Sequence, residues 1–168
     1  MSEYSPTHLF TLVPEGFSDR KNRETIFCTL FPTEKDAEVL SVPVPQYSAV
    51  LIYSWEGRNR SITPEPGVLP TVFKHLKDLS ALKDHNKLIV DFDIDRKQTC
   101  ILLAEGEKLI AANSYHTVDF PTAVYYMLEL LSKSQINPQQ TTVNLIGKAD
   151  DSQLKMLRSY VKDIKLCL

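Results

Sequence analysis

Two acidic residues and a threonine flank one polar turn, and they are the first combination that could do chemistry. Asp91 and Asp93 close one apolar run, and Thr99 opens the next run after the turn. The carboxylates could hold a magnesium ion and the hydroxyl could meet a phosphate, which would make a nucleotide site. A phosphate loop also needs glycine, because backbone amides must approach the phosphate oxygens closely. This turn has no glycine, and its three carboxylates would repel a triphosphate, so we expect a charged hairpin that binds no nucleotide.

A second combination would hold two metal ions. Two-metal nucleases bind a phosphate between Mg²⁺ ions that carboxylates from several elements coordinate. The chain offers Asp91 or Asp93 on a strand, Glu129 on a helix, and Asp150 or Asp151 after a later strand. It offers no basic track for a nucleic acid backbone, so a metal-dependent nuclease is the weaker alternative.

The remaining candidate residues give weaker indications. The histidines lack the convergent spacing of a metal site: His8, His75, His85 and His116. Cys100 lies in an apolar strand, where we expect an inert thiol. Trp55, Arg58 and Arg60 could form a small surface for a partner protein.

Composition restricts the classes of function. The chain has 168 residues and a net charge of -2, which argues against bulk attraction to nucleic acid or to an anionic membrane. No apolar run is long enough to span a bilayer, and the first residues lack the pattern of a signal peptide. Three cysteines without metal-type spacing argue against a disulfide framework. We therefore expect a cytoplasmic protein.

The elements that must position these residues are clearest after residue 86. Residues 87–118 hold three strand-like runs separated by short turns at residues 95–97 and 105–108, a pattern that predicts an antiparallel meander. Asp119 can cap a helix over residues 120–132, in which Tyr125 and Tyr126 are expected to pack, with one hydroxyl at the surface.

A strand over residues 141–146 follows. Asp151 or Ser152 is then expected to cap a final helix that runs to about Asp163 and buries Tyr160, before a last strand begins. The order β-β-β-α-β-α-β implies a mixed sheet with right-handed crossovers. That order is the ribonuclease H-like unit, which also forms each half of actin-like ATPases, and it specifies a fold rather than an activity.

The first part of the chain predicts a smaller β-α-β-β segment over residues 1–60. Its helix is expected to end at Leu30 with Ile26, Phe27 and Leu30 buried. Residues 61–86 are expected to form a linker and a connecting helix over residues 69–82.

Three stretches resemble a bacterial family without an established activity whose members have an actin-like ATPase fold. The stretches are FTLVPEGF (residues 10–17), TAVYYMLELL (122–131) and NLIGKADDSQLKMLRSYV (144–161). The resemblance implies an α/β fold, with residues 1–60 as the remnant of a first actin-like half and residues 87–168 as the ribonuclease H-like second half. It also implies longer relatives, so we expect the chain to be truncated at both ends.

Three hypotheses about function follow. The favoured one is a non-catalytic interaction or scaffold protein on a degenerate actin-like fold, with an unidentified protein partner, no cofactor, and possible homo-oligomers. The first alternative is an ATP and Mg²⁺ binder of the ATPase or kinase class that uses Asp91, Asp93 and Thr99. The second alternative is the nuclease, with metal ions on Asp91, Asp93, Glu129 and Asp150.

Overall fold

The computed structural model describes residues 3–34, 36–55 and 66–167. The chain divides into two compact units, Met1–Lys77 and Asp78–Leu168. Arg58 and Arg60 lie outside the described residues, and Trp55 is the last described residue before them.

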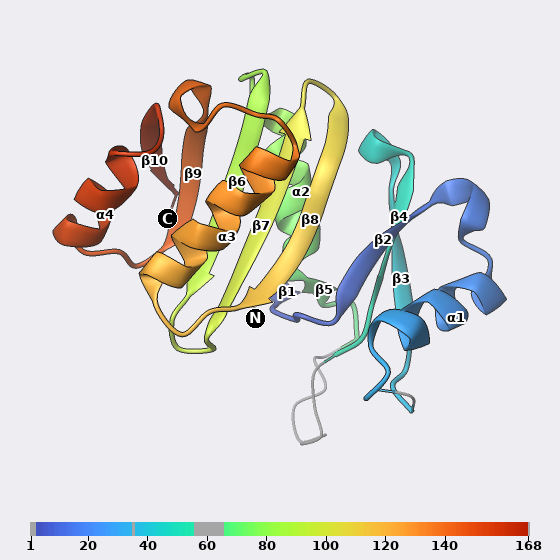
Figure 1. Cartoon of the computed structure of the whole chain (residues 1–168). Coiled ribbons are helices and arrows are strands. Elements are labelled where there is room, and N and C mark those ends of the chain that lie inside the picture. The colour runs from blue at the N-terminus through green and yellow to red at the C-terminus, as the bar shows by residue number, and fades with distance from the viewer. Residues whose placement is uncertain (1–2, 35, 56–65, 168) are drawn as a thin grey trace. The chain divides into compact units, whose positions relative to one another are not determined.

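The first unit holds a three-stranded antiparallel sheet in the order β2-β4-β3 (Figure 1). Its elements in chain order are β1 (Tyr4–Ser5), β2 (Phe10–Pro14), the 3-10 helix η1 (Glu15–Phe17), α1 (Arg20–Leu30), β3 (Leu40–Val44), η2 (Pro45–Tyr47), β4 (Ala49–Tyr53) and β5 (Leu69–Pro70). The central strand β4 is buried along its whole length. The order β2-α1-β3-β4 matches the β-α-β-β expectation, and the assignment of this segment to a first actin-like half stays a prediction.

Helix α1 differs from expectation in what it buries. Asp19 caps it by accepting a hydrogen bond from the Asn22 amide at 3.1 Å. Phe27 is its buried side chain, whereas Leu30 is 53% exposed, so the prediction of a buried Leu30 was wrong. The helix therefore covers its neighbours with a narrow apolar stripe.

Helix α2 (Thr71–Ala81) begins two residues later than expected and crosses the division between the units. Leu69 and Pro70 instead pair in parallel with β1, because a residue before proline is pushed from the helical into the extended region. Val72, Leu76 and Leu79 are buried, as their helical spacing predicts.

The second unit is one mixed sheet in the order β10-β9-β6-β7-β8, with α3 and α4 on the same face (Figure 1). Strands β6, β7 and β8 pair antiparallel, and β9 and β10 continue the sheet in parallel with β6. The bounds are β6 (Asn86–Asp93), β7 (Gln98–Glu105), β8 (Lys108–His116), α3 (Phe120–Lys133), η3 (Pro138–Gln140), β9 (Thr142–Gly147), α4 (Asp151–Arg158) and β10 (Asp163–Cys167). The predicted order β-β-β-α-β-α-β is confirmed.

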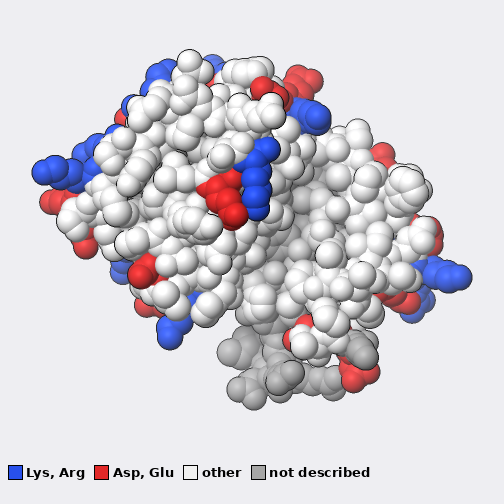
Figure 2. Space-filling view, in the orientation of Figure 1, with Lys and Arg blue, Asp and Glu red and all other residues white. Residues whose placement is uncertain are grey.

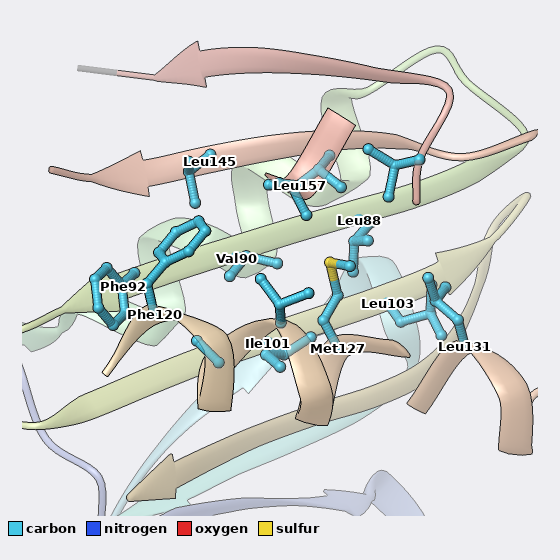
Figure 3. Packing of buried hydrophobic residues seen from close by; sticks show 14 of the residues in the cluster. Leu88, Val90, Phe92, Ile101, Leu103, Phe120, Met127, Leu131, Leu145 and Leu157 are labelled. Atoms are coloured by element: carbon cyan, nitrogen blue, oxygen red, sulfur yellow. The ribbon is translucent and has the colours of Figure 1, made fainter. Parts of the chain in front are cut away.

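Alternate residues of these strands build the core beneath α3 and α4. Figure 3 shows Phe120, Met127 and Leu131 of α3 directed toward the strands. The core cluster consists of Leu88, Val90, Phe92, Ile101, Leu103, Phe120, Ala123, Val124, Met127, Leu131, Ile136, Val143, Leu145, Leu154, Leu157 and Val161. Because successive strand residues point to opposite faces, the residues between these positions lie on the other face of the sheet.

The last helix is shorter than its apolar pattern predicts. Helix α4 ends at Arg158, and the Tyr160 amide donates to the Leu157 carbonyl at 3.0 Å in a turn. Tyr160 is 45% exposed, so a helix to Asp163 and a buried Tyr160 were both wrong. The chain must turn here because β10 begins at Asp163 and pairs with β9.

The described helices are short. Helices α1 and α2 have 11 residues each, α3 has 14 and α4 has 8. Among the described residues, no helix is long and apolar enough to cross a membrane.

Candidate functional site

Asp91 lies on the face of the sheet that α3 and α4 do not cover. It alternates with Val90 and Phe92, which belong to the core cluster. Across the strands it stands opposite Cys100 of β7 and Ile146 of β9. Its half-buried carboxylate therefore borders a thiol and an aliphatic side chain.

Asp93 shapes the turn between β6 and β7. Its Oδ1 accepts a hydrogen bond from the Arg96 amide at 3.1 Å, and its Oδ2 lies 3.5 Å from the Arg96 guanidinium. Lys97 adopts φ 54°, and its amide donates to the Ile94 carbonyl at 3.2 Å. A lysine thus takes the left-handed conformation that a glycine often takes in such turns.

Thr99 is sealed inside the protein on the α3 side. It pairs with Phe92, so its side chain lies on the opposite face of the sheet from Asp91. Its side chain is fully buried, and its Oγ1 lies 2.7 Å from Oγ1 of the equally buried Thr117. The structure does not bring the three predicted nucleotide residues together, because the sheet separates the hydroxyl from the carboxylates.

The residues of the predicted nuclease are also spread out. Glu129 forms an ion pair with Lys133 at 2.9 Å, one turn further along α3, the helix on the face opposite Asp91. Asp150 caps α4, where its carboxylate and the Gln153 side chain form a capping box. Across the described ranges, no group of three or more His, Cys, Asp or Glu side chains could hold a metal ion.

The amino-terminal ends of α3 and α4 carry their own carboxylates. Oδ1 of Asp119 accepts hydrogen bonds from the Thr122 hydroxyl at 2.6 Å and from the Thr122 amide at 2.8 Å. Asp150 accepts from the Ser152 hydroxyl at 2.7 Å and the Gln153 amide at 2.8 Å. These hydrogen bonds lower the pKa of both carboxyl groups. Helix amino termini often bind phosphates, and here aspartates use these donors.

The surroundings of Cys100 keep its thiol protonated. Desolvation raises the pKa of its thiol, and the nearby Asp91 carboxylate raises it further. A protonated thiol is a poor nucleophile, which agrees with the expectation of an inert cysteine. All three cysteines, Cys28, Cys100 and Cys167, are free.

Two residues of β9 were not singled out from the sequence. The side chain of Asn144 is buried and donates to the Leu88 carbonyl at 3.0 Å, across from β9 to β6. Gly147 has φ +101°, and a side chain there would overlap the backbone of Phe92. A glycine after an apolar strand and an asparagine within it were the available signals.

A groove of about 580 Å³ lies in the first unit, between α1 and the approach to β3. Arg20 of this groove pairs with Glu24 at 3.0 Å, and Arg23 donates to the Ser41 hydroxyl. Both arginines thus have a partner among the residues that line the groove.

A tyrosine face covers the outer side of α3 and the adjoining part of β8. Tyr115 stacks on Tyr126 with ring centroids 4.5 Å apart, and Tyr125 meets Tyr126 edge to face at 5.5 Å. Tyr125 is 60% exposed, so its exposure and the partial burial of Tyr126 agree with the expectation for this pair. Figure 2 shows acidic and basic atoms side by side in the middle of a largely uncharged surface. The tyrosine face consists of Asn113, Tyr115, Tyr125, Tyr126, Glu129 and Lys133.

The sheet order and the two helices on one face define an actin-like ATPase fold. A crystal structure of a Bacteroides thetaiotaomicron protein with an actin-like ATPase fold and unknown function matches this chain with a TM-score of 0.80 and 16% sequence identity. The match covers 96% of this chain and 66% of that chain, and it shows the fold alone. The chain belongs to the family described as "Protein of unknown function (DUF3822)", whose model matches residues 4–164. No curated protein matches the sequence. The predicted fold and family resemblance are thereby confirmed.

Proposed function

We propose that this protein is a non-catalytic interaction protein of the cytoplasm, built on an actin-like fold that binds no nucleotide. The observation that carries the proposal is the separation of Thr99 from Asp91 and Asp93. The Thr99 hydroxyl is fully buried and bonded to Thr117, whereas Asp91 lies on the opposite face of the sheet. A phosphate cannot reach both groups without taking the hairpin apart.

The helix termini support the same conclusion. A nucleotide in this class of fold needs backbone donors for its phosphates. One first-turn amide of each helix, that of Thr122 in α3 and that of Gln153 in α4, already donates to the carboxylate of Asp119 or Asp150. A phosphate that used these two amides would have to displace a carboxylate that is covalently part of the chain. The free thiols support a reducing compartment.

The tyrosine face supports the interaction role. Interface cores are enriched in tyrosine and depleted of lysine and glutamate. The only charged residues of α3, Glu129 and Lys133, neutralise each other at 2.9 Å. A face with three tyrosines and no net charge suits a protein partner with an uncharged contact surface, and it does not suit a nucleic acid backbone.

Thermal unfolding with and without millimolar Mg-ATP tests the nucleotide part of the proposal. A ligand at a hundred times its dissociation constant would add about 2.7 kcal/mol, which corresponds to roughly 5–10 °C for a chain of this size. We expect no shift. A magnesium-dependent rise that Asp91→Asn abolishes and the matched turn variant Asp95→Asn retains would overturn the proposal.

Affinity capture tests the interaction part. We expect a specific partner to be retained by the wild type and by Tyr160→Ala, which alters an exposed tyrosine outside the tyrosine face. Tyr125→Ala should lose that partner, because it removes the most exposed ring of the face. Equal retention by both variants would show that the tyrosine face is not the binding surface. If the wild type retains no partner, the proposed interaction role is refuted.

A further inference from the structure

Strand β10 forms one edge of the five-stranded sheet. It pairs with β9 on one side, and among the described residues no strand pairs with its other side. Edge strands present backbone donors and acceptors to any strand that can lie beside them. The residues of β10 determine which strand that would be.

The apolar face of the sheet continues to this edge. Ile164 stands opposite Val143 and packs against the core cluster, and Leu166 stands opposite Leu145. Leu145 is 1% exposed, whereas Leu166 is 58% exposed. The core-facing row therefore ends in an exposed leucine that a neighbouring strand would cover.

The backbone of β10 shows which residues direct their groups outward. The Ile164 amide donates to Oδ1 of Asp163 at 2.8 Å. This amide therefore points away from β9, and in the single chain the Asp163 carboxylate accepts its hydrogen bond. Because backbone groups alternate between the two sides of a strand, the outward positions are Ile164 and Leu166.

We propose that two copies of this chain associate through antiparallel pairing of their β10 strands about a two-fold axis at Ile164. The outward groups of Ile164 would then exchange both hydrogen bonds with Ile164 of the second copy. Asp163 would lie directly opposite Lys165 of the second copy, and the reverse pair would follow by symmetry. The two sheets would join into one.

Charge selects this register over its neighbour. A two-fold axis at Lys165 would place two lysines opposite each other, which is unfavourable in a sheet. The axis at Ile164 replaces that repulsion with two pairs of opposite charge on the face away from α4. The Asp163 carboxylate would leave the Ile164 amide, and Lys165 would leave Asp84, which lies 3.6 Å away in the single chain. With a strand of only five residues, the association is weak and concentration-dependent.

Sedimentation equilibrium over a concentration series, with charge reversals at two exposed positions, tests the pairing. We expect the wild type to dimerise at the highest concentrations, and Lys165→Glu or Asp163→Lys alone to remain monomeric. The double variant Asp163→Lys/Lys165→Glu should dimerise again, because it restores opposite charges across the axis. A wild type that remains monomeric at every concentration would overturn the proposal, and a double variant that remains monomeric would overturn the register.

Disulfide trapping tests the register independently. In a Cys167→Ser background, Ile164→Cys should form a cross-linked dimer on mild oxidation, because its two copies would be directly opposite each other. Leu166→Cys is the matched control, since its two copies would lie about 14 Å apart along the strands, too far for a bond. Cross-linking of the control alone would refute the axis at Ile164. The outcome is independent of whether the tyrosine face binds a partner.

Discussion

Replacing Gly147 by alanine should destabilise the second unit strongly, although this glycine ends a strand, a place where a phosphate-binding glycine could also occur. Its φ of +101° is unfavourable for any side chain, at a cost of about 1–3 kcal/mol. An added Cβ would lie 3.0 Å from the Phe92 carbonyl carbon and closer still to its oxygen. Relieving that overlap between β9 and β6 costs about 1–3 kcal/mol more.

Gly106→Ala provides the matched control. Gly106 also has a positive φ, +58°, but its nearest neighbour would be a His85 ring atom at 3.9 Å. The control should lose about 1–2 kcal/mol, the cost of an L-residue in the left-handed region. Both variants gain the same small entropic benefit in the unfolded chain, so the benefit cancels in the comparison.

Urea unfolding followed by circular dichroism measures the difference. We expect Gly147→Ala to be less stable than Gly106→Ala by about 2–3 kcal/mol, which lowers the urea midpoint by about 1 M or more. That loss is a large part of the 5–15 kcal/mol typical of a domain. If Gly147→Ala unfolds at the same midpoint as Gly106→Ala or above it, the close approach of Gly147 to Phe92 is wrong, and a ligand role for this glycine becomes the better explanation.

Three further predictions concern single side chains. Thr99→Val should cost about 1–3 kcal/mol, because it leaves the buried Thr117 hydroxyl without its partner, and the double variant with Thr117→Val should cost less than the sum in a double-mutant cycle. Hydrogen bonds lower the folded pKa of Asp119, so its contribution is complete above the unfolded pKa of about 3.9 and is lost as the pH falls through the folded value. Asp119→Asn should therefore flatten the fall in melting temperature below about pH 4, and an unchanged slope would contradict this role. A thiol reagent should label the exposed Cys167 quickly and the half-buried Cys100, whose thiol has a raised pKa, much more slowly, and equal native rates would contradict this difference.

The sequence predicted the sheet of the second unit because each strand is a distinct apolar run. The turns after β6 and β7 and the cap at Asp119 also have recognisable residues. The end of α4 could not be predicted, since the apolar spacing continues through Tyr160 although the chain turns there to start β10. The tyrosine face could not be predicted in full either. Tyr115 and Tyr126 are 11 residues apart, and only the return of α3 over β8 stacks them.

The three predicted nucleotide residues do not meet because the turn between β6 and β7 is one residue longer than expected. A turn of three residues, 95–97, would place Asp93 opposite Thr99, with both side chains on one face of the sheet. The observed turn has four residues, 94–97, because Lys97 adopts the left-handed conformation, and Thr99 then pairs with Phe92. A shift of one residue reverses the face of every later side chain in a strand, so Thr99 points into the core beside Thr117. The residue types alone would fit a nucleotide site. The length of the turn separates the Thr99 hydroxyl from the carboxylates, and neither composition nor motif encodes that length.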